Sequence, residues 1–170
     1  MENWVNKVAE SGIITLDLEQ FFSKKPVVSF DLKPFLFMGL ILKEKDFRQQ
    51  LKELDLTPYK EKSVAVHCSA DAIIPQWAYM LVASLLQPEA AVVLFGTEQD
   101  AETMLLLRAI DQIDASVYEN QRVVVKGCGD RPIPDAAYLN ITNKLRPVAK
   151  SIMFGEPCST VPVYKKKNTP

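Results

Sequence analysis

The chain has 170 residues, 48% of them hydrophobic and 24% charged, as is usual for a globular protein long enough to bury a substantial core. Its formal net charge of −1 gives no reason to expect nucleic acid or an anionic membrane as a partner. No stretch reaches the roughly 18 consecutive apolar residues that a membrane helix needs, and residues 1–4 lack the pattern of a signal peptide. We therefore expect a cytoplasmic protein.

The N-terminal third predicts two strands followed by a helix. Residues 13–16 and 27–30 are short runs rich in β-branched residues, which favour strands. Residues 44–54 place Phe47, Leu51 and Leu54 at helical spacing, which indicates an amphipathic helix. We expect residues 1–61 to form an α+β segment that packs on the core of a single domain covering residues 1–165, with residues 166–170 as a flexible tail.

The rest of the chain contains an internal repeat. A shift of 59 positions aligns residues 62–97 with 121–156 without a gap, and 12 of the 36 pairs are identical. About two identities are expected between unrelated segments, so we interpret the match as a duplication. The shared pattern runs V-x-V, then D-x-x-I-P-x-x-A-Y, then L-x-P, and ends in F-G.

Each copy of the repeat predicts a strand, a helix and a second strand. The apolar runs 64–66 and 123–125 favour buried strands, and Pro75 and Pro134 suit the start of a helix. Residues 92–95 and 151–154 predict the closing strands, and residues 101–113 a helix between the copies. The fold class is therefore α/β: a mostly parallel sheet with flanking helices, built on a duplicated β-α-β unit.

Three cysteines follow predicted strands. Cys68 and Cys128 come after the first strand of each copy, and Cys158 comes shortly after the last strand. Ligands of parallel α/β sheets gather at the carboxyl ends of the strands, so we expect the three thiols to lie at the same end of one sheet. In a reducing compartment an odd number of cysteines is not a disulfide framework.

The cysteines predict a metal site in which Cys68, Cys128 and Cys158 are ligands, completed by Asp71, Asp130 or Glu156. Three thiolates and one further ligand can hold zinc in a tetrahedral site, or an iron–sulfur cluster. The other interpretation is that each cysteine is a small packed hydrophobe, and the two aspartates also suit capping of the loop before each helix. His67, the single histidine, is a further candidate ligand or base.

Two weaker patterns remain open. The segment Lys126-Gly127-Cys128-Gly129-Asp130-Arg131 is glycine-rich and basic, so it could cradle a phosphate, but it matches no known phosphate-binding motif. A single reactive thiol, Cys68 or Cys128, could serve an enzyme, although the residues name no reaction. A non-enzymatic interaction module with packed cysteines is the third alternative.

Six segments of the chain carry a resemblance to a known family: ITLDLE (14–19), GLILKEKDFR (39–48), CSADAIIP (68–75), WAYML (77–81), KGC (126–128) and KSIMFGEPCSTVP (150–162). Through them the chain resembles a bacterial family of unknown function, domain-of-unknown-function family 2480. The resemblance covers nearly the whole chain, with two departures, Leu56 for an aromatic residue and Pro157 for alanine.

The resemblance implies a genomic context. Members of the family are often encoded beside sulfur-mobilisation proteins of iron–sulfur assembly, which favours iron–sulfur chemistry over zinc. We therefore hypothesise an accessory protein of metal or iron–sulfur cluster handling. Its expected partners are iron–sulfur assembly proteins, and a homodimer is a further alternative. No nucleic-acid or membrane partner is expected.

Overall fold

The computed structural model describes residues 12–127, 129–156 and 158–167. The chain divides into two compact units, which we call the central unit (residues 23–104) and the terminal unit (residues 1–22 and 105–170). The boundary falls within one helix, α4, so this helix belongs in part to each unit. Compact units can belong to one domain, so the single domain expected over residues 1–165 stays a prediction.

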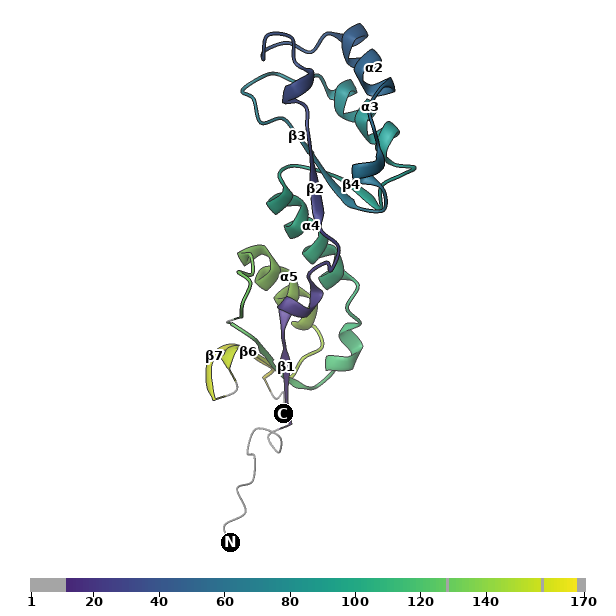
Figure 1. Ribbon diagram of the computed structural model, residues 1–170. Coiled ribbons are helices and arrows are strands. Elements are labelled where there is room, and N and C mark those ends of the chain that lie inside the picture. Colours follow the sequence, from purple (N-terminus) through teal and green to yellow (C-terminus); the bar gives the residue numbers. More distant parts are fainter. Residues whose placement is uncertain (1–11, 128, 157, 168–170) are drawn as a thin grey trace. The chain divides into compact units, whose positions relative to one another are not determined.

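The central unit contains a parallel sheet of three strands in the order β2-β3-β4 (Figure 1). Its elements in chain order are β2 (Val27–Asp31), α2 (Glu44–Lys52), β3 (Ser63–His67), α3 (Gln76–Leu86), β4 (Val92–Phe95) and the start of α4 (Glu98–Asp111), with short 3-10 helices at Lys33–Phe35 and Thr57–Tyr59.

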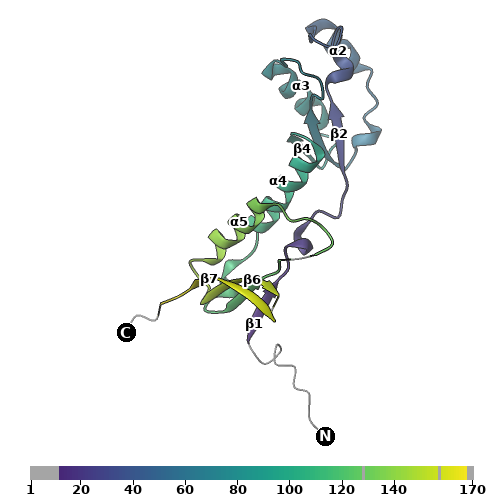
Figure 2. The same cartoon turned by 90° about the vertical axis from the view of Figure 1, so that its left-hand side faces the viewer.

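The terminal unit contains a sheet of four strands in the order β1-β5-β6-β7. Its elements are β1 (Ile13–Leu16), the end of α4, β5 (Arg122–Val125), α5 (Asp135–Leu145), β6 (Ser151–Glu156) and β7 (Ser159–Lys165), with 3-10 helices at Leu18–Phe21 and Ala115–Tyr118. The first three strands are parallel, and β7 pairs with β6 in the antiparallel sense (Figure 2).

The predicted fold class is confirmed, since the chain is α/β with mostly parallel strands and flanking helices. The expectation of one sheet is corrected: the described residues form two sheets, because β3 pairs with β2 and β4 whereas β5 pairs with β1 and β6. Among the residues that the structure describes, no helix is long and apolar enough to cross a membrane.

Each unit has its own hydrophobic core. Helices α2 and α3 bury Phe47, Leu51, Ala78, Val82 and Leu86 against Phe30, Val64 and Val66 of the central sheet. Helices α4 and α5 bury Leu106, Ile110, Ala137, Ile141 and Leu145 against Leu16, Val123, Val125 and Ile152 of the terminal sheet. The apolar residues on one face of each helix thus pack against strand residues that point to one face of the sheet.

The two copies of the repeat have the same local structure. Helices α3 and α5 have equal lengths and start 59 residues apart. The backbone matches as well, since φ is positive at Glu61 and Asn120 before the first strand, at Gly96 directly after β4, and at Gly155 near the end of β6. This likeness agrees with the sequence identity, while its origin by duplication stays an interpretation.

The two N-terminal strands also resemble each other, but they lie 14 positions apart in the sequence and not 59. Strand β1 and its 3-10 helix read TLDLEQF (15–21), and β2 and its 3-10 helix read SFDLKPF (29–35). Asp17 and Asp31 each accept a hydrogen bond from the backbone N–H two residues later, at 3.0 and 2.9 Å. Leu18 and Leu32 are then buried, each in the core of its own unit.

The substitution Leu145→Ala should lower the free energy of unfolding by about 2–5 kcal/mol, because it leaves a cavity in the terminal core. Leu145 is fully buried, whereas Leu139 of the same helix is 69% exposed. Leu139→Ala is therefore the control and should change stability by no more than about 0.5 kcal/mol. Urea unfolding measures both, and equal effects would contradict this assignment of the core.

Candidate functional site

In the central unit the loop after β3 is held by an acidic side chain at the end of β2. Asp31 Oδ1 accepts a hydrogen bond from the backbone N–H of Ser69 at 2.9 Å, and Asp31 Oδ2 accepts one from the Ser69 hydroxyl at 2.5 Å. Ser69 directly follows Cys68, which is half-buried. The carboxylate thus fixes the backbone beside the thiol.

These contacts also affect the ionisation of Asp31. Removal from water raises the pKa of its carboxyl, but hydrogen bonds from Ser69 and Lys33 and the charge of His67 outweigh this effect and lower the pKa below 3.8. The carboxylate is therefore charged at neutral pH and supports the loop in its acceptor form.

His67, the last residue of β3, and Tyr79 of α3 also lie near the end of β3. The Nε2 atom of His67 lies 2.7 Å from the hydroxyl of Ser29. Burial raises the pKa of Tyr79, and the negative charge of Cys68 raises it further, so the thiol and the phenol lie within electrostatic reach of each other. The ring of Tyr79 packs edge-on against Phe95, with 5.3 Å between the centroids.

In the terminal unit the corresponding strand end carries an ion pair. Lys126 Nζ lies 3.1 Å from Asp17 Oδ2, at the ends of the neighbouring strands β5 and β1. The hydrogen bond and charge of Asp17 raise the pKa of Lys126, and the charges of Glu156 and Glu19 add to this, against a smaller opposing effect of desolvation. Lys126 therefore keeps its positive charge at neutral pH.

The loop after β5 passes close to two side chains, Phe154 of β6 and Glu19 of the 3-10 helix that follows β1. A Cβ atom at Gly127 would lie 2.5 Å from the Phe154 ring, and one at Gly129 would overlap the Glu19 carboxylate. Glu19 Oε1 also accepts a hydrogen bond from the Arg131 backbone N–H at 2.5 Å. Only glycine fits at both positions without a shift of these neighbours, and one residue lies between the two glycines in the sequence.

That residue is Cys128, which lies outside the described residues. Cys158 is exposed, in the turn between β6 and β7, where Glu156 pairs with Ser159. Because β5 and β6 are adjacent and parallel, with Val125 beside Phe154, the chain leaves both strands at the same end of the terminal sheet. The segments that contain Cys128 and Cys158 therefore start at neighbouring strand ends.

The structure divides the predicted site residues between two sheets. Cys68 and Asp71 follow β3 of the central sheet, whereas Asp130, Glu156 and Cys158 belong to the terminal sheet. This corrects the inference that all three cysteines follow strands of one sheet, because each copy of the repeat pairs with its own N-terminal strand. Asp71 and Asp130 are exposed, and Glu156 is half-buried.

Within the described ranges, no group of three or more His, Cys, Asp and Glu side chains is arranged to hold a metal ion. Since Cys128 is not among those residues, the predicted set of ligands stays a prediction.

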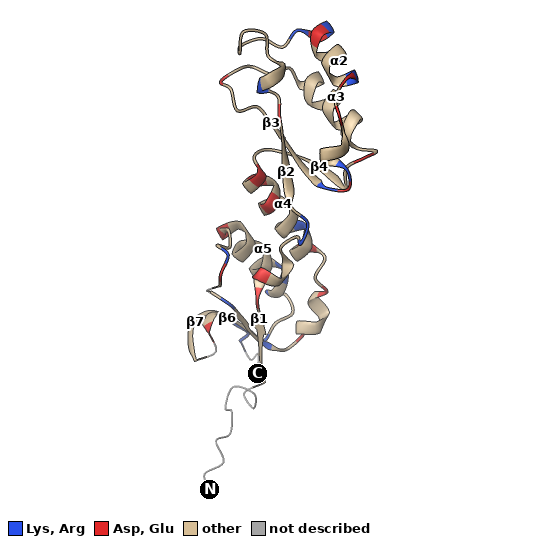
Figure 3. Cartoon of the chain, viewed as in Figure 1, with Lys and Arg blue, Asp and Glu red and all other residues tan. Residues whose placement is uncertain are grey.

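Sequence reasoning missed the acidic residues Asp17, Glu19 and Asp31. A signal was present, namely the pattern Asp-Leu-x-x-Phe after each of the first two strands. It was overlooked because its offset of 14 residues differs from the offset of 59 in the main repeat. Both signs of charge occur in each unit, as expected from the near-zero net charge (Figure 3).

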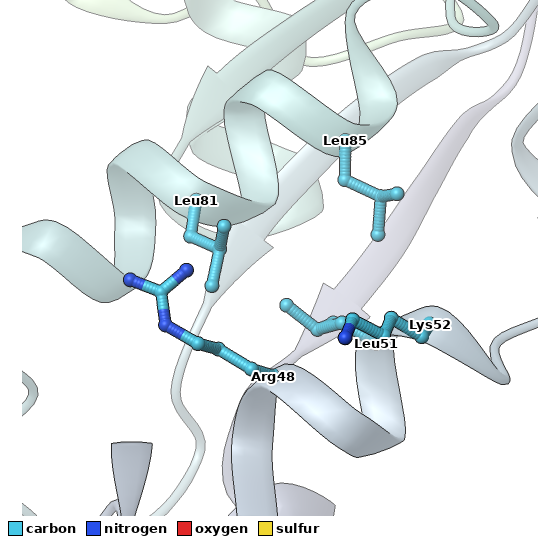
Figure 4. Close-up of a pocket in the computed structure, with 5 residues that line it drawn as sticks. All are labelled: Arg48, Leu51, Lys52, Leu81 and Leu85. Atoms are coloured by element: carbon cyan, nitrogen blue, oxygen red, sulfur yellow. The ribbon is translucent and has the colours of Figure 1, made fainter. Parts of the chain in front are cut away.

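Two recesses are further candidates for a ligand site, and the second of them reaches the ends of β5 and β6 at Val125 and Phe154. One of about 260 Å³ lies between α2 and α3, with Leu51, Leu81 and Leu85 as apolar walls and Arg48 and Lys52 beside them (Figure 4). The other, of about 330 Å³, lies along α5 and β6 and includes Tyr138, Thr142, Phe154 and Val163 of β7. No described cysteine lines either recess.

The fold and the loops define an α/β protein with thiol-bearing loops at the carboxyl ends of parallel strands. A family model described as "Protein of unknown function (DUF2480)" matches residues 2–166. The chain belongs to this family. Comparison with curated proteins and with solved structures found no match.

The substitution Gly127→Ala should destabilise the protein by about 1–3 kcal/mol, because the added methyl group meets an aromatic ring that is itself packed. The Phe154 ring contacts Tyr138 at 5.5 Å between centroids. In a double-mutant cycle, Phe154→Ala should remove most of the penalty of Gly127→Ala. Strictly additive effects in urea unfolding would contradict the contact.

The substitution Asp31→Asn should lower the free energy of unfolding by about 1–2 kcal/mol at pH 7, where the charged carboxylate accepts hydrogen bonds. The pKa of Asp31 is lowered on folding, so its contribution is present above pH 3.8 and is lost as the pH falls through the folded-state pKa. The variant and the natural protein should therefore converge in strong acid. Asp71→Asn, an exposed change in the same loop, is the control, and a constant difference at all pH values would contradict the prediction.

Proposed function

We propose that the protein is an accessory factor of metal or iron–sulfur handling that binds a thiophilic cargo at the strand ends of the terminal unit. Cys128 and Cys158 would be its thiol ligands, and Cys68 a third thiol on the central unit. The observation that carries the proposal is the pairing of β5 with β6, since the segments with Cys128 and Cys158 start at neighbouring ends of these parallel strands.

The residues around these segments suit thiolate chemistry. Lys126 lies two residues before Cys128 in the sequence and keeps its positive charge in an ion pair with Asp17. A cation beside a cysteine favours the thiolate form that binds metal, and Lys126 is the candidate for this role at Cys128. Thiolates select zinc, copper(I) and iron–sulfur clusters over hard cations. The exposure of Cys158 leaves it accessible to a cargo delivered from solution.

Two carboxylates are candidates to complete the ligand set. Asp130 lies in the Cys128 loop, and Glu156 ends β6 two residues before Cys158. Two thiolates and two carboxylates are four donors, which is the number that a tetrahedral zinc ion takes. An iron–sulfur cluster with non-cysteine ligands is the alternative cargo, and its bound form would supply electron transfer or sulfur for transfer.

The proposal fits a protein that passes its cargo to others. Cys158 is exposed, so a ligand bound through this thiol would stay open to a second protein. We accordingly propose iron–sulfur assembly proteins as partners and the cytoplasm as the location. Neither a reaction nor a substrate is needed for this role.

A thiol-dependent enzyme is the second candidate, favoured by the surroundings of Cys68. Asp31 holds the backbone beside this thiol, and Tyr79 lies within electrostatic reach of it. In such an enzyme the Cys68 thiol would be the nucleophile and the Tyr79 phenol a neighbouring proton donor. A packed, non-functional thiol is the remaining interpretation for Cys68.

Metal and acid-labile sulfide should be measured on protein purified without oxygen, together with its absorption spectrum, for the natural chain and for single Cys→Ser variants. We expect bound metal in the natural protein, and a loss of at least tenfold in Cys128→Ser and in Cys158→Ser. Cys68→Ser is the matched control and should keep the metal, because Cys68 follows a strand of the other sheet.

Iron with sulfide would identify a cluster, and metal without sulfide would identify an ion such as zinc. Equal loss of metal in all three variants would mean that all three cysteines bind one centre, and would contradict the site with two thiols. Absence of metal from every preparation, including protein reconstituted with iron and sulfide or with zinc, would contradict the proposal and favour the enzyme with Cys68.

A further inference from the structure

The outer edges of strands β4 and β6 occupy equivalent positions in the two copies of the repeat but differ in what covers them. Both strands follow their helices at the same spacing and pair with the preceding strand in the same parallel register. Strand β7 covers the outer edge of β6 in the antiparallel sense. In the described part of the chain, β4 has no strand on its outer edge.

The difference appears in the exposure of matching side chains. Phe154 of β6, which pairs with Val161 of β7, is 39% exposed, whereas its counterpart Phe95 of β4 is 67% exposed. Ile152 is fully buried, whereas its counterpart Val93 is only half-buried. The central unit thus leaves open the apolar surface that β7 covers in the terminal unit.

A groove runs along this open edge. It has a volume of about 400 Å³ and is lined by Ala83, Gln87, Ala90, Ala91, Val92 and Val93. In the terminal unit Thr142, the counterpart of Ala83, lines a recess together with Val163 of β7. The small alanine side chains therefore leave room where the terminal unit places a valine from an added strand.

Strand β4 is short, with four residues, but it lacks the other features that protect exposed edges. Natural proteins discourage pairing at an edge with proline, charged side chains or bulges. The edge strand β7 contains Pro162 and Lys165, whereas β4 is Val-Val-Leu-Phe with neither. Its backbone is also ready to pair: Gly96 N–H donates to Val66 of β3, so by alternation the N–H groups of Val93 and Phe95 point away from β3.

We propose that two copies of the chain associate by pairing β4 with β4 in the antiparallel sense across a two-fold axis. A two-fold axis perpendicular to a sheet pairs an edge strand with its own copy in the antiparallel sense, which is the sense that β7 adopts on β6. The two central sheets then form one sheet of six strands, and the apolar side chains of one β4 cover the groove of the other.

The small area of the proposed β4–β4 interface determines the expected affinity of the dimer. Four residues on each strand and a shallow groove bury less than the roughly 1,200 Å² of a standard stable interface. We therefore expect a reversible dimer that forms over a range of tens to hundreds of micromolar, on the order of other small interfaces. The dimer requires none of the three cysteines, so it is independent of the proposed metal function.

The test is sedimentation equilibrium over about a hundredfold range of protein concentration, spanning the dissociation constants expected of a small interface. The natural chain should shift from monomer to dimer, whereas Phe95→Lys should weaken the dimer at least tenfold, because it places a charge on the paired edge. Phe95 is largely exposed, so the monomer should keep its circular dichroism spectrum.

Met80→Lys is the matched control. Met80 is 72% exposed, and its counterpart Leu139 remains 69% exposed although β7 is present in its unit. A strand on the edge therefore does not cover this position, and Met80→Lys should dimerise like the natural chain.

Hydrogen exchange gives a second readout that needs no variant. The amides of Val93 and Phe95 should become protected as the protein concentration rises. A monomer at every concentration, a dimer that Phe95→Lys leaves intact, or amides of β4 that exchange equally fast in monomer and dimer would each overturn the proposal.

Discussion

One interaction recurs in both units and holds their functional loops: a carboxylate after the first strand of the sheet binds the loop that follows the second. Asp31 accepts two hydrogen bonds from Ser69, and Glu19 accepts one from Arg131. The first strand must therefore lie beside the second, as it does for β2 with β3 and for β1 with β5. If either pair separated, the thiol-bearing loop would lose its support.

This bracing ties the site to the core of each unit. Asp17 caps the 3-10 helix Leu18–Phe21, whereas Asp31 ends β2 just before the 3-10 helix Lys33–Phe35, and the leucine that follows each aspartate is buried. The orientation of the carboxylates thus depends on the packing of Leu18 and Leu32. In the terminal unit the same strand ends also hold Lys126 next to Asp17, so the thiols there are proposed to act beside a fixed positive charge.

Local features of the sequence predicted most of the elements but not their partners. The periodicity around Phe47 and the apolar run at residues 64–66 define α2 and β3. Pairing of β1 with β5 cannot be predicted in this way, because Asp17 and Lys126 lie 109 positions apart and nothing local to β1 excludes β2 as its neighbour.

Strand β7 is not predicted from the sequence, since Pro162 argues against a strand. The proline is tolerated there because β7 is an edge strand. The cysteines were found from their place after strands, whereas the glutamate and aspartates that brace their loops required knowledge of which strands are adjacent.

The central functional claim is that Cys128 and Cys158 act together at one end of the terminal sheet. The most direct measurement is cross-linking of the metal-free, reduced protein with dibromobimane, which becomes fluorescent when it bridges two nearby thiols, followed by identification of the joined peptides. The account predicts rapid intramolecular bridging of Cys128 with Cys158, abolished by Cys158→Ser and retained in Cys68→Ser. Bridging that involves Cys68 instead, or no bridging between any two cysteines of the folded protein, would contradict it.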